Sequence, residues 1–239
     1  MARAEISIIA PVSNQADIQD VVDEYERALE RIGRPHELLL VVNGPEDETL
    51  TACMSAAERH PTVRVFRTRK KGWGHAVRIG LAECRGDVVC YTNSARTTGQ
   101  DLGLILLYAL MNPGVVVKAN RRIRDSWRRR LGSLLYNLEC RALFDLSHWD
   151  VNGTPKVFPR EFSHLLVLRQ KDDLIDAEFA SICARERYPI LEVPISSSSR
   201  RSGRSTTNYI SAIKMYWGAW ALSRRMRPRG RHRAVSDKR

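Results

Sequence analysis

The sequence predicts an α/β domain with a mainly parallel central sheet, and three observations support this fold class. Short apolar runs alternate four times with segments whose apolar residues recur at helical spacing. The links between them are short, as is usual for parallel strands joined by crossover helices. The chain has 239 residues, 43% of them hydrophobic, which is enough for one good-sized core and too few for a second full domain.

The first half of the chain is expected to hold four strands and the helices between them. The strands are predicted at residues 6–10, 37–42, 63–67 and 88–92. Ser13 and Asn14 can cap the first helix. The buried face of that helix is marked by Ile18, Val21, Val22, Tyr25, Leu29 and Ile32. Two more helices are expected to end near Arg59 and Cys84, and residues 102–111 are expected to form a buried helix.

The second half is less regular. Strands are predicted at 115–119, 156–158 and 190–195, a basic loop at 120–130, and helices at 174–187 and after the Ser/Arg/Gly-rich loop 196–207. An amphipathic helix after the basic loop is marked by Leu131, Leu134, Leu135, Leu138 and Ala142. Residues 1–227 are expected to form one domain, and the Arg/Pro/Gly-rich residues 228–239 a disordered basic tail.

The net charge of +12 is concentrated at one end of the chain. Residues 200–239 carry twelve Lys or Arg and one acid, so the rest of the chain is almost neutral. Such an arm attracts phosphate on anionic lipid or on nucleic acid, or it only keeps the terminus soluble. Nucleic acid is the less favoured partner because the charge is not spread over a folded face and no known binding motif is present.

Cysteine usage and hydropathy predict a cytoplasmic protein, at most peripheral at the inner face of the membrane. The five cysteines are scattered and lack CxxC spacing, which is typical of reduced thiols and not of disulfides or a zinc site. No apolar run approaches the roughly 20 residues that cross a bilayer, and no signal peptide is expected.

Residues that follow the strands are the first candidates for a site, because ligands of such sheets bind beyond the carboxyl ends of the strands. These residues are 11–15, 43–46, 69–75 and 93–97.

Ten short motifs occur in the order seen in family 2 glycosyltransferases. They include Ile8-Ile-Ala-Pro-Val-Ser-Asn-Gln15, Glu37-Leu-Leu-Leu-Val-Val-Asn-Gly44, Lys71-Gly-Trp-Gly-His-Ala-Val-Arg-Ile-Gly80, Gly86-Asp-Val-Val-Cys-Tyr-Thr-Asn-Ser-Ala95 and Asp150-Val-Asn-Gly-Thr-Pro-Lys-Val-Phe158. Over residues 5–226 the chain resembles this family, especially its polyprenyl-phosphate (dolichol-phosphate mannose synthase) branch. The resemblance implies a GT-A fold, a Rossmann-like three-layer sandwich with a mixed sheet, and sugar transfer from a nucleoside-diphosphate sugar.

The resemblance also implies which residues bind the donor. Contacts to the nucleotide sugar are expected from Pro11, Ser13, Asn14, Asn43, Gly72, Gly74, Asn93 and Ala95. Contacts to phosphate are expected from Lys71, Arg121, Arg122, Arg129, Arg204 and Ser205. Several have ordinary structural alternatives: Asn43 and the two glycines are typical of turns.

Asp150 and Asp176 are the candidate catalytic residues, because the resemblance places Asp150 near the sugar and acceptor and Asp176 on the acceptor side. Either carboxylate would be the candidate base for a hydroxyl acceptor. Asp150 could instead cap the turn at Gly153, and Asp176 could favour a helix N-terminus. A lipid-phosphate acceptor is already an anion and needs no strong base. The loop 196–207 and the last helix, rich in Arg, Trp and Tyr, are expected to guide it at the membrane surface.

The sequence departs from the family where a divalent cation is usually bound. Asn93 and Ala95 replace the two aspartates of the D-x-D motif, and Asn43 replaces the aspartate after the second strand. A neutral amide is a poor ligand for a hard dication. Mg²⁺ or Mn²⁺ is therefore possible but not favoured. Fixed cations are expected to hold the leaving diphosphate in an inverting transfer, the alternative being a catalytically inactive binding protein.

Overall fold

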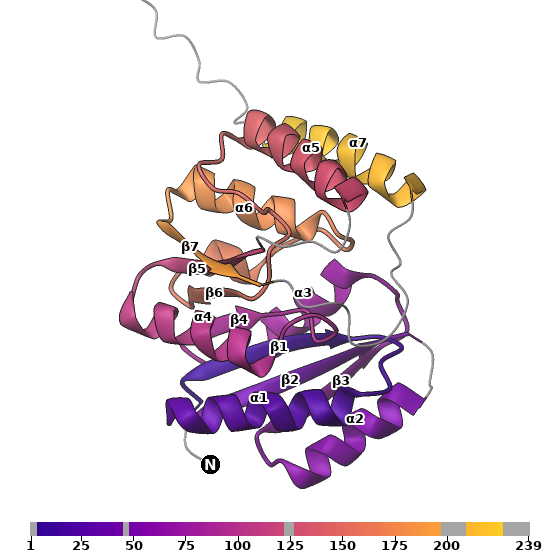
Figure 1. Cartoon of the computed structure of the whole chain (residues 1–239), viewed down its shortest axis with the longest axis vertical. Helices are drawn as coiled ribbons and strands as arrows, with labels where there is room; N and C mark the ends of the chain where they lie inside the picture. The colour runs from indigo at the N-terminus through magenta and orange to yellow at the C-terminus, as the bar shows by residue number, and fades with distance from the viewer. Residues whose placement is uncertain (1–3, 45–47, 122–126, 197–208, 227–239) are drawn as a thin grey trace, which may run out of the picture.

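A seven-stranded mixed sheet forms the centre of the molecule (Figure 1). The computed structural model describes residues 4–44, 48–121, 127–196 and 209–226, without the side chains of 127–130 and 209–213. The strand order is β3-β2-β1-β4-β6-β5-β7. The strands are β1 (Ile6–Val12), β2 (His36–Asn43), β3 (Val63–Thr68), β4 (Val88–Tyr91), β5 (Val116–Arg121), β6 (Lys156–Pro159) and β7 (Ile190–Ile195).

Only one of these strands runs against the others. β6 is antiparallel to both β4 and β5, and every other pair in the sheet is parallel. The carboxyl ends of the other six strands therefore lie at one edge of the sheet. Lys156, the first residue of β6, lies at the same edge, paired with Tyr91 and Lys118. The predicted mixed, mainly parallel sheet is confirmed.

Helices cover both faces of the sheet, and the apolar side chains of each face form a separate cluster. α1 (Ile18–Ile32), α2 (Glu48–Arg59) and α4 (Gly99–Met111) pack on one face. α3 (Trp73–Glu83) and α6 (Ile175–Glu186) pack on the other, with the 3-10 turn η1 (Ser163–Leu166). α5 (Trp127–Phe144) and α7 (Tyr209–Met226) form a further layer over α6 (Figure 1).

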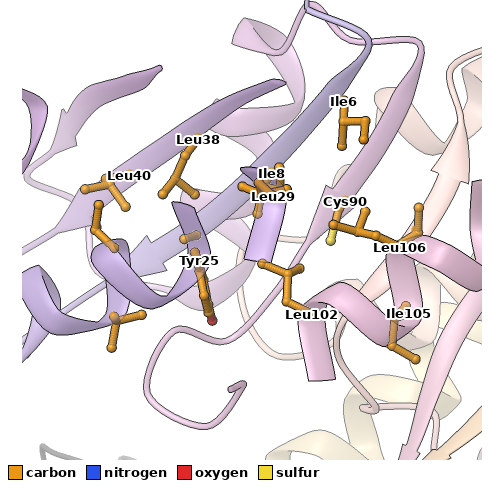
Figure 2. Packing of buried hydrophobic residues seen from close by; sticks show 14 of the residues in the cluster. Ile6, Ile8, Tyr25, Leu29, Leu38, Leu40, Cys90, Leu102, Ile105 and Leu106 are labelled. Atoms are coloured by element: carbon orange, nitrogen blue, oxygen red, sulfur yellow. The ribbon is translucent and has the colours of Figure 1, made fainter. Parts of the chain in front are cut away.

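The core under α1 and α4 shows why these helices form where the apolar spacing predicts them. Tyr25 and Leu29 of α1 lie over the strands beside Leu38 of β2, while Leu102 and Ile105 of α4 pack alongside (Figure 2). All five side chains are buried. Apolar burial of this kind, at roughly 25 cal/mol per Å² removed from water, is the main force that holds the helices on the sheet.

The structure corrects several predicted boundaries. α1 begins at Ile18 with Asp17 at its N-cap, so Ser13 and Asn14 do not cap it. Residues 120 and 121 end β5, and 127–130 open α5, so the predicted basic loop 120–130 is wrong at both ends. Pairing with β7 continues as far as Arg121, which holds this residue in the sheet.

The structure also corrects two predicted helix faces. The helix at 102–111 is buried on one side only, since Leu107 and Met111 are exposed. The leucines that mark the amphipathic face of α5 are exposed as well. The inward face of α5 is formed instead by Tyr136, Cys140 and Phe144. α5 carries two apolar stripes, and spacing alone does not say which one faces α6.

All five cysteines lie within the described residues, where they are buried and form no disulfide bond. Within the ranges given above, none of the helices combines the length and the apolar character needed to cross a membrane.

Candidate active site

The loop after β1 combines exposed and buried polar residues at the shared edge of the sheet. Ser13 and Asn14 are exposed, and Asn14 has a φ of 47°, a left-handed conformation that asparagine tolerates. Gln15 is buried, and its Oε1 accepts a hydrogen bond from the Ser94 hydroxyl at 2.7 Å. The same hydroxyl lies 3.0 Å from the carbonyl of Pro11. These contacts fix the β1 loop against the loop after β4.

The carboxyl end of β2 and the start of α3 meet beside that loop. Asn43 donates from Nδ2 to the carbonyl of Gly72 at 3.3 Å. A Cβ on Gly72 would lie 2.5 Å from the Lys171 carbonyl oxygen, and one on Gly74 would lie 2.6 Å from that of Asp172. Both glycines are thus required for α3 to approach the 170–172 backbone. Their predicted contact with the nucleotide sugar stays a prediction.

The position of the family's metal-binding aspartates does not fit a divalent cation. The Oδ1 atom of Asn93 accepts from the backbone N–H of Ala95 at 3.2 Å, so the side chain closes its own turn. Ala95 is buried, and its side chain offers no metal ligand. Among the residues that the structure describes, no group of three His, Cys, Asp or Glu side chains could hold a metal ion. A site for Mg²⁺ or Mn²⁺ would need oxygen ligands that these residues do not supply.

Arg121 and Asp150 form a bidentate ion pair at the carboxyl end of β5. The Nε and Nη2 atoms of Arg121 lie 2.8 and 2.7 Å from the two carboxylate oxygens, and its backbone N–H lies 3.0 Å from Oδ2. Asp150 is 4% exposed and has a φ of 47°. Burial opposes the charge of Arg121, but the Asp150 carboxylate outweighs it and raises the Arg121 pKa. The two side-chain hydrogen bonds fix the direction of the guanidinium group, and the backbone bond holds the Asp150 carboxylate beside β5.

The turn that carries Asp150 is packed closely under β5. The N–H of Gly153 donates to the backbone carbonyl of Asp150 at 2.7 Å, which closes the turn through the main chain, and capping by the Asp150 side chain stays a prediction. A Cβ on Gly153 would lie 2.1 Å from the Ala119 carbonyl oxygen, so no other residue fits. Asn137 of α5 accepts from the N–H of Val151 at 2.8 Å. The geometry therefore gives Asp150 both a structural role in the turn and a position beside Arg121.

Asp176 lies in the first turn of α6, where three side chains hold it. Its Oδ1 accepts from the ammonium of Lys156 and, at 2.9 Å, from the Tyr91 hydroxyl. Its Oδ2 accepts from Trp73 Nε1 at 3.2 Å. Lys156 is fully buried, and burial lowers its pKa while Asp176 opposes that change. Burial, together with the charge of Asp176, holds the pKa of Tyr91 well above its usual value.

Lys118 of β5 is a second buried lysine in this region. Its ammonium lies 2.7 Å from Glu192 Oε1 of β7 and also donates to the carbonyl of Trp149. Burial lowers the pKa of Lys118, and the Glu192 carboxylate opposes this. Lys118, Lys156 and Arg121 thus each have a carboxylate partner within the described part of the chain.

The sequence reading missed Lys118, Lys156, Tyr91 and Glu192 as site residues. A signal was present, since Lys118 interrupts one apolar strand segment and Lys156 opens another. A lysine in a buried strand requires a hydrogen-bonded anionic partner. Spacing did not identify that partner, because Asp176 and Glu192 lie on other elements.

The predicted phosphate-binding residues are only partly placed. Arg121 is anchored as described, and Lys71 is exposed on the loop before α3. Arg122, Arg204 and Ser205 lie outside the described residues, as does the side chain of Arg129. The roles predicted for all of them stay predictions, together with those of Asp150 and Asp176.

In chemical terms, this edge of the sheet offers oriented ion pairs in a partly buried setting, in which a carboxylate balances each cation. A unit charge about 4 Å from another contributes about 4 kcal/mol at an effective dielectric of 20. Arg121 is the cation whose direction is best defined, because its partner uses two of its nitrogens. Groups oriented in this way need little reorganisation when an anion binds or when charge develops on it.

Comparison with known proteins bears on the family of the chain and on its fold. A family model described as glycosyl transferase family 2 matches residues 7–163. An undecaprenyl-phosphate 4-deoxy-4-formamido-L-arabinose transferase from Pectobacterium carotovorum is 27% identical over 220 residues, which cover 89% of this chain and 65% of that protein. The corresponding Pseudomonas fluorescens protein is 30% identical over 137 residues, 56% of this chain and 40% of that protein. The chain therefore spans less than two thirds of the length of these relatives.

Solved structures share the fold at low identity. Glucosyl-3-phosphoglycerate synthase from Mycobacterium tuberculosis, solved with Mn²⁺, uridine diphosphate and phosphoglyceric acid, superposes with a TM-score of 0.73 at 18% identity. The match covers 96% of this chain and 81% of that one. A structure described as a mycobacterial protein gives 0.72 at 19% identity, covering 93% and 75%. The predicted GT-A architecture is confirmed.

Proposed function

The chain belongs to glycosyl transferase family 2, and from this premise we propose that it transfers a sugar from a nucleoside-diphosphate sugar to a lipid phosphate. The acceptor class is suggested by relatives named as undecaprenyl-phosphate transferases. A uridine nucleotide is the first donor to test, because a structural neighbour was solved with uridine diphosphate. The sugar itself has to be found by experiment.

The Arg121–Asp150 pair is the observation that best supports transfer. Departure of a nucleoside diphosphate builds negative charge on its phosphates, and a catalyst must offset that charge. Asp150 holds the Arg121 guanidinium at the edge where ligands of parallel sheets bind. In this proposal, Arg121 and the neighbouring basic residues Lys71, Arg122 and Arg129 accept the diphosphate without a divalent cation.

The acceptor in this proposal needs no catalytic base. A lipid phosphate is already ionised and attacks the sugar carbon opposite the departing diphosphate, which inverts that centre. Asp150 then acts mainly by holding Arg121, and Asp176 by holding Lys156. A hydroxyl acceptor would require one of these carboxylates to release its partner and accept a proton. The basic last helix and loop 196–207 would meet the membrane in which a lipid acceptor lies.

The test is a panel of UDP-, GDP- and dTDP-sugars with undecaprenyl phosphate in detergent. Release of nucleoside diphosphate and formation of lipid-linked sugar are measured with EDTA and, in parallel, with Mn²⁺. We expect turnover with one donor, equal in EDTA and in Mn²⁺. Activation by Mn²⁺ of about tenfold or more would contradict the metal-free part of the proposal and leave the transferase part standing.

A catalytically inactive binding protein is the second candidate, because the loss of both D-x-D aspartates favours it. This candidate predicts a thermal shift with a sugar nucleotide but no diphosphate release with any acceptor. In that case Arg121→Ala should reduce the thermal shift, and neither the wild type nor the variant should release diphosphate.

A further inference from the structure

The outermost layer of the molecule carries exposed apolar side chains on both of its helices. α5 and α7 lie side by side in this layer, on the side of α6 away from the sheet (Figure 1). The exposed residues, together called the docking face, are Leu131, Leu134, Leu135, Leu138, Trp217 and Trp220. The four leucines are 44–50% exposed and recur at i, i+3, i+4 and i+7, which places them on one side of α5.

The two helices are fixed to each other, so the docking face is a surface of the fold. The Tyr216 hydroxyl of α7 donates to the Gly132 carbonyl of α5 at 2.9 Å, and the Tyr136 and Tyr216 rings meet edge to face at 5.7 Å. The inward sides of both helices, including Cys140 and Leu222, are buried with α6. The outward leucines and tryptophans are therefore presented to solvent on a fixed two-helix surface.

The two helices that carry the docking face are basic in sequence. α7 contains Lys214, Arg224 and Arg225 and no acidic residue over its length, and α5 contains one acid, Glu139, against four arginines. The Arg224 guanidinium stacks on Trp220, 4.8 Å from the ring centroid. Tryptophan beside arginine is the pairing favoured at the headgroup level of a bilayer, and lysine and arginine attract anionic lipid.

We propose that the docking face inserts shallowly into an anionic bilayer, with the α5 leucines among the acyl chains and the α7 arginines at the headgroups. The longest segments outside the described residues have little apolar sequence to offer this face, since 197–208 has no large apolar residue and 227–239 has only Val235. A second copy would bring the same arginines together, at an electrostatic cost. An anionic membrane satisfies both the apolar and the charged side chains.

A second exposed stripe on α4 provides a matched control. Leu104, Leu107, Tyr108 and Met111 are exposed at the same helical spacing. α4 contains no lysine or arginine and carries Asp101. Removing apolar area from α4 therefore tests exposed hydrophobicity without the positive charge that distinguishes the docking face.

The experiment measures co-sedimentation of the full chain with phosphatidylcholine vesicles that contain about one third phosphatidylglycerol. Leu134→Gln/Leu138→Gln is compared with Leu107→Gln/Met111→Gln, and thermal melts confirm that both variants fold. We expect the α5 variant to lose about tenfold or more in vesicle affinity and the α4 variant to lose less than about twofold. Blue-shifted tryptophan emission of the wild type on vesicles should accompany binding.

Three outcomes would overturn the inference: no vesicle binding by the wild type, equal binding by the α5 variant, or equal losses in both variants. A wild-type dimer that the α5 substitutions dissociate, without vesicle binding, would assign the face to a second copy. The membrane contact itself is inferred from α5 and α7 alone. Only its purpose, which is to bring the site to a lipid acceptor, rests on the proposed function. Transfer to undecaprenyl phosphate in detergent should survive in the α5 variant, so absence of transfer in every form would reject the function and not the docking face.

Discussion

At the scale of single residues, the site is organised by carboxylates that hold cations. Asp150 holds Arg121, Asp176 holds Lys156, and Glu192 holds Lys118. A buried pair of this kind gains little net stability, because desolvation offsets much of the attraction, whereas loss of one partner is costly. Positioning of charge is therefore the better explanation for three such pairs near one edge.

Arg121→Ala should weaken binding of the sugar nucleotide. A hydrogen bond to a charged group contributes about 1.5–3 kcal/mol, so Kd should rise roughly ten- to a hundredfold. Arg121→Lys should recover only part of this loss, because lysine cannot bind bidentately. Calorimetric titration with the preferred donor measures the change.

Arg64→Lys is the matched control for Arg121, since Arg64 pairs with Glu37 near the opposite end of β2. Donor affinity should stay within about twofold in this variant. Equal losses at both positions would show that any disturbed ion pair weakens binding, and the specific role of Arg121 would be rejected.

His148 should make the folded protein sensitive to acid. Burial and the neighbouring Lys118, Lys156 and Arg141 lower its pKa to about 3, from 6.5 for a free side chain. Between these values the unfolded chain binds a proton that the folded protein does not, so the free energy of unfolding falls as pH falls. From pH 7 to pH 5 this contribution is about 2 kcal/mol.

Urea unfolding at pH 7 and pH 5 tests the histidine. The wild type should lose about 2 kcal/mol more than His148→Asn between these pH values. His36 acts in the opposite sense, because its partner Glu26 outweighs burial and raises its pKa. Parallel losses in the wild type and the His148 variant would contradict the prediction.

At the scale of helices and strands, the sequence predicts well where an element lies and whether it is a helix or a strand. It predicts less well which face of the element is buried. The strands at 37–42 and 190–195 lie within one residue of β2 and β7. Their apolar runs are bounded by polar or proline residues, so few alternatives exist. α5 differs because its exposed leucines match the helical period as well as the buried Tyr136 and Cys140 do. Only tertiary packing against α6 decides between the two stripes.

The candidate site, too, could be predicted from the sequence only in part. Motif order leads to Arg121 and Asp150, which the structure joins directly. It does not reveal that Lys156 and Tyr91 converge on Asp176, because these contacts span 20 and 85 positions in the chain. The antiparallel course of β6 brings Lys156 to this edge, and nothing in the local sequence predicts that direction.

The start of α3 should be intolerant of a side chain. Gly74→Ala places a Cβ 2.6 Å from a backbone carbonyl oxygen, and we expect a loss of about 1–3 kcal/mol in the free energy of unfolding. Gly103→Ala in α4 is the control, since its Cβ would meet only Ala28, at 3.8 Å. That change should raise the free energy of unfolding by about 0.5–1 kcal/mol. Equal effects in a urea titration would show that close packing is not the cause.

At the scale of the whole molecule, positive charge is concentrated at one end of the sequence. Residues 227–239 carry six Lys or Arg and one acid. Truncation after Met226 should lower affinity for nucleic acid about tenfold or more at low salt, because each lost phosphate contact removes a counterion-release contribution. Affinity for the sugar nucleotide should not change. A fall in donor affinity of similar size would place the tail in the active site.

Within the described residues, β6 is the strand that links the two halves of the sheet. Four residue pairs join β6 to β4 and two join it to β5, and no other described strand bridges these groups. Peeling β6 away would separate the Asn43 side of the sheet edge from the Arg121 side. Slow deuterium uptake at the backbone amides of Val157 and Phe158 would thus show that these two sides of the sheet edge rarely separate.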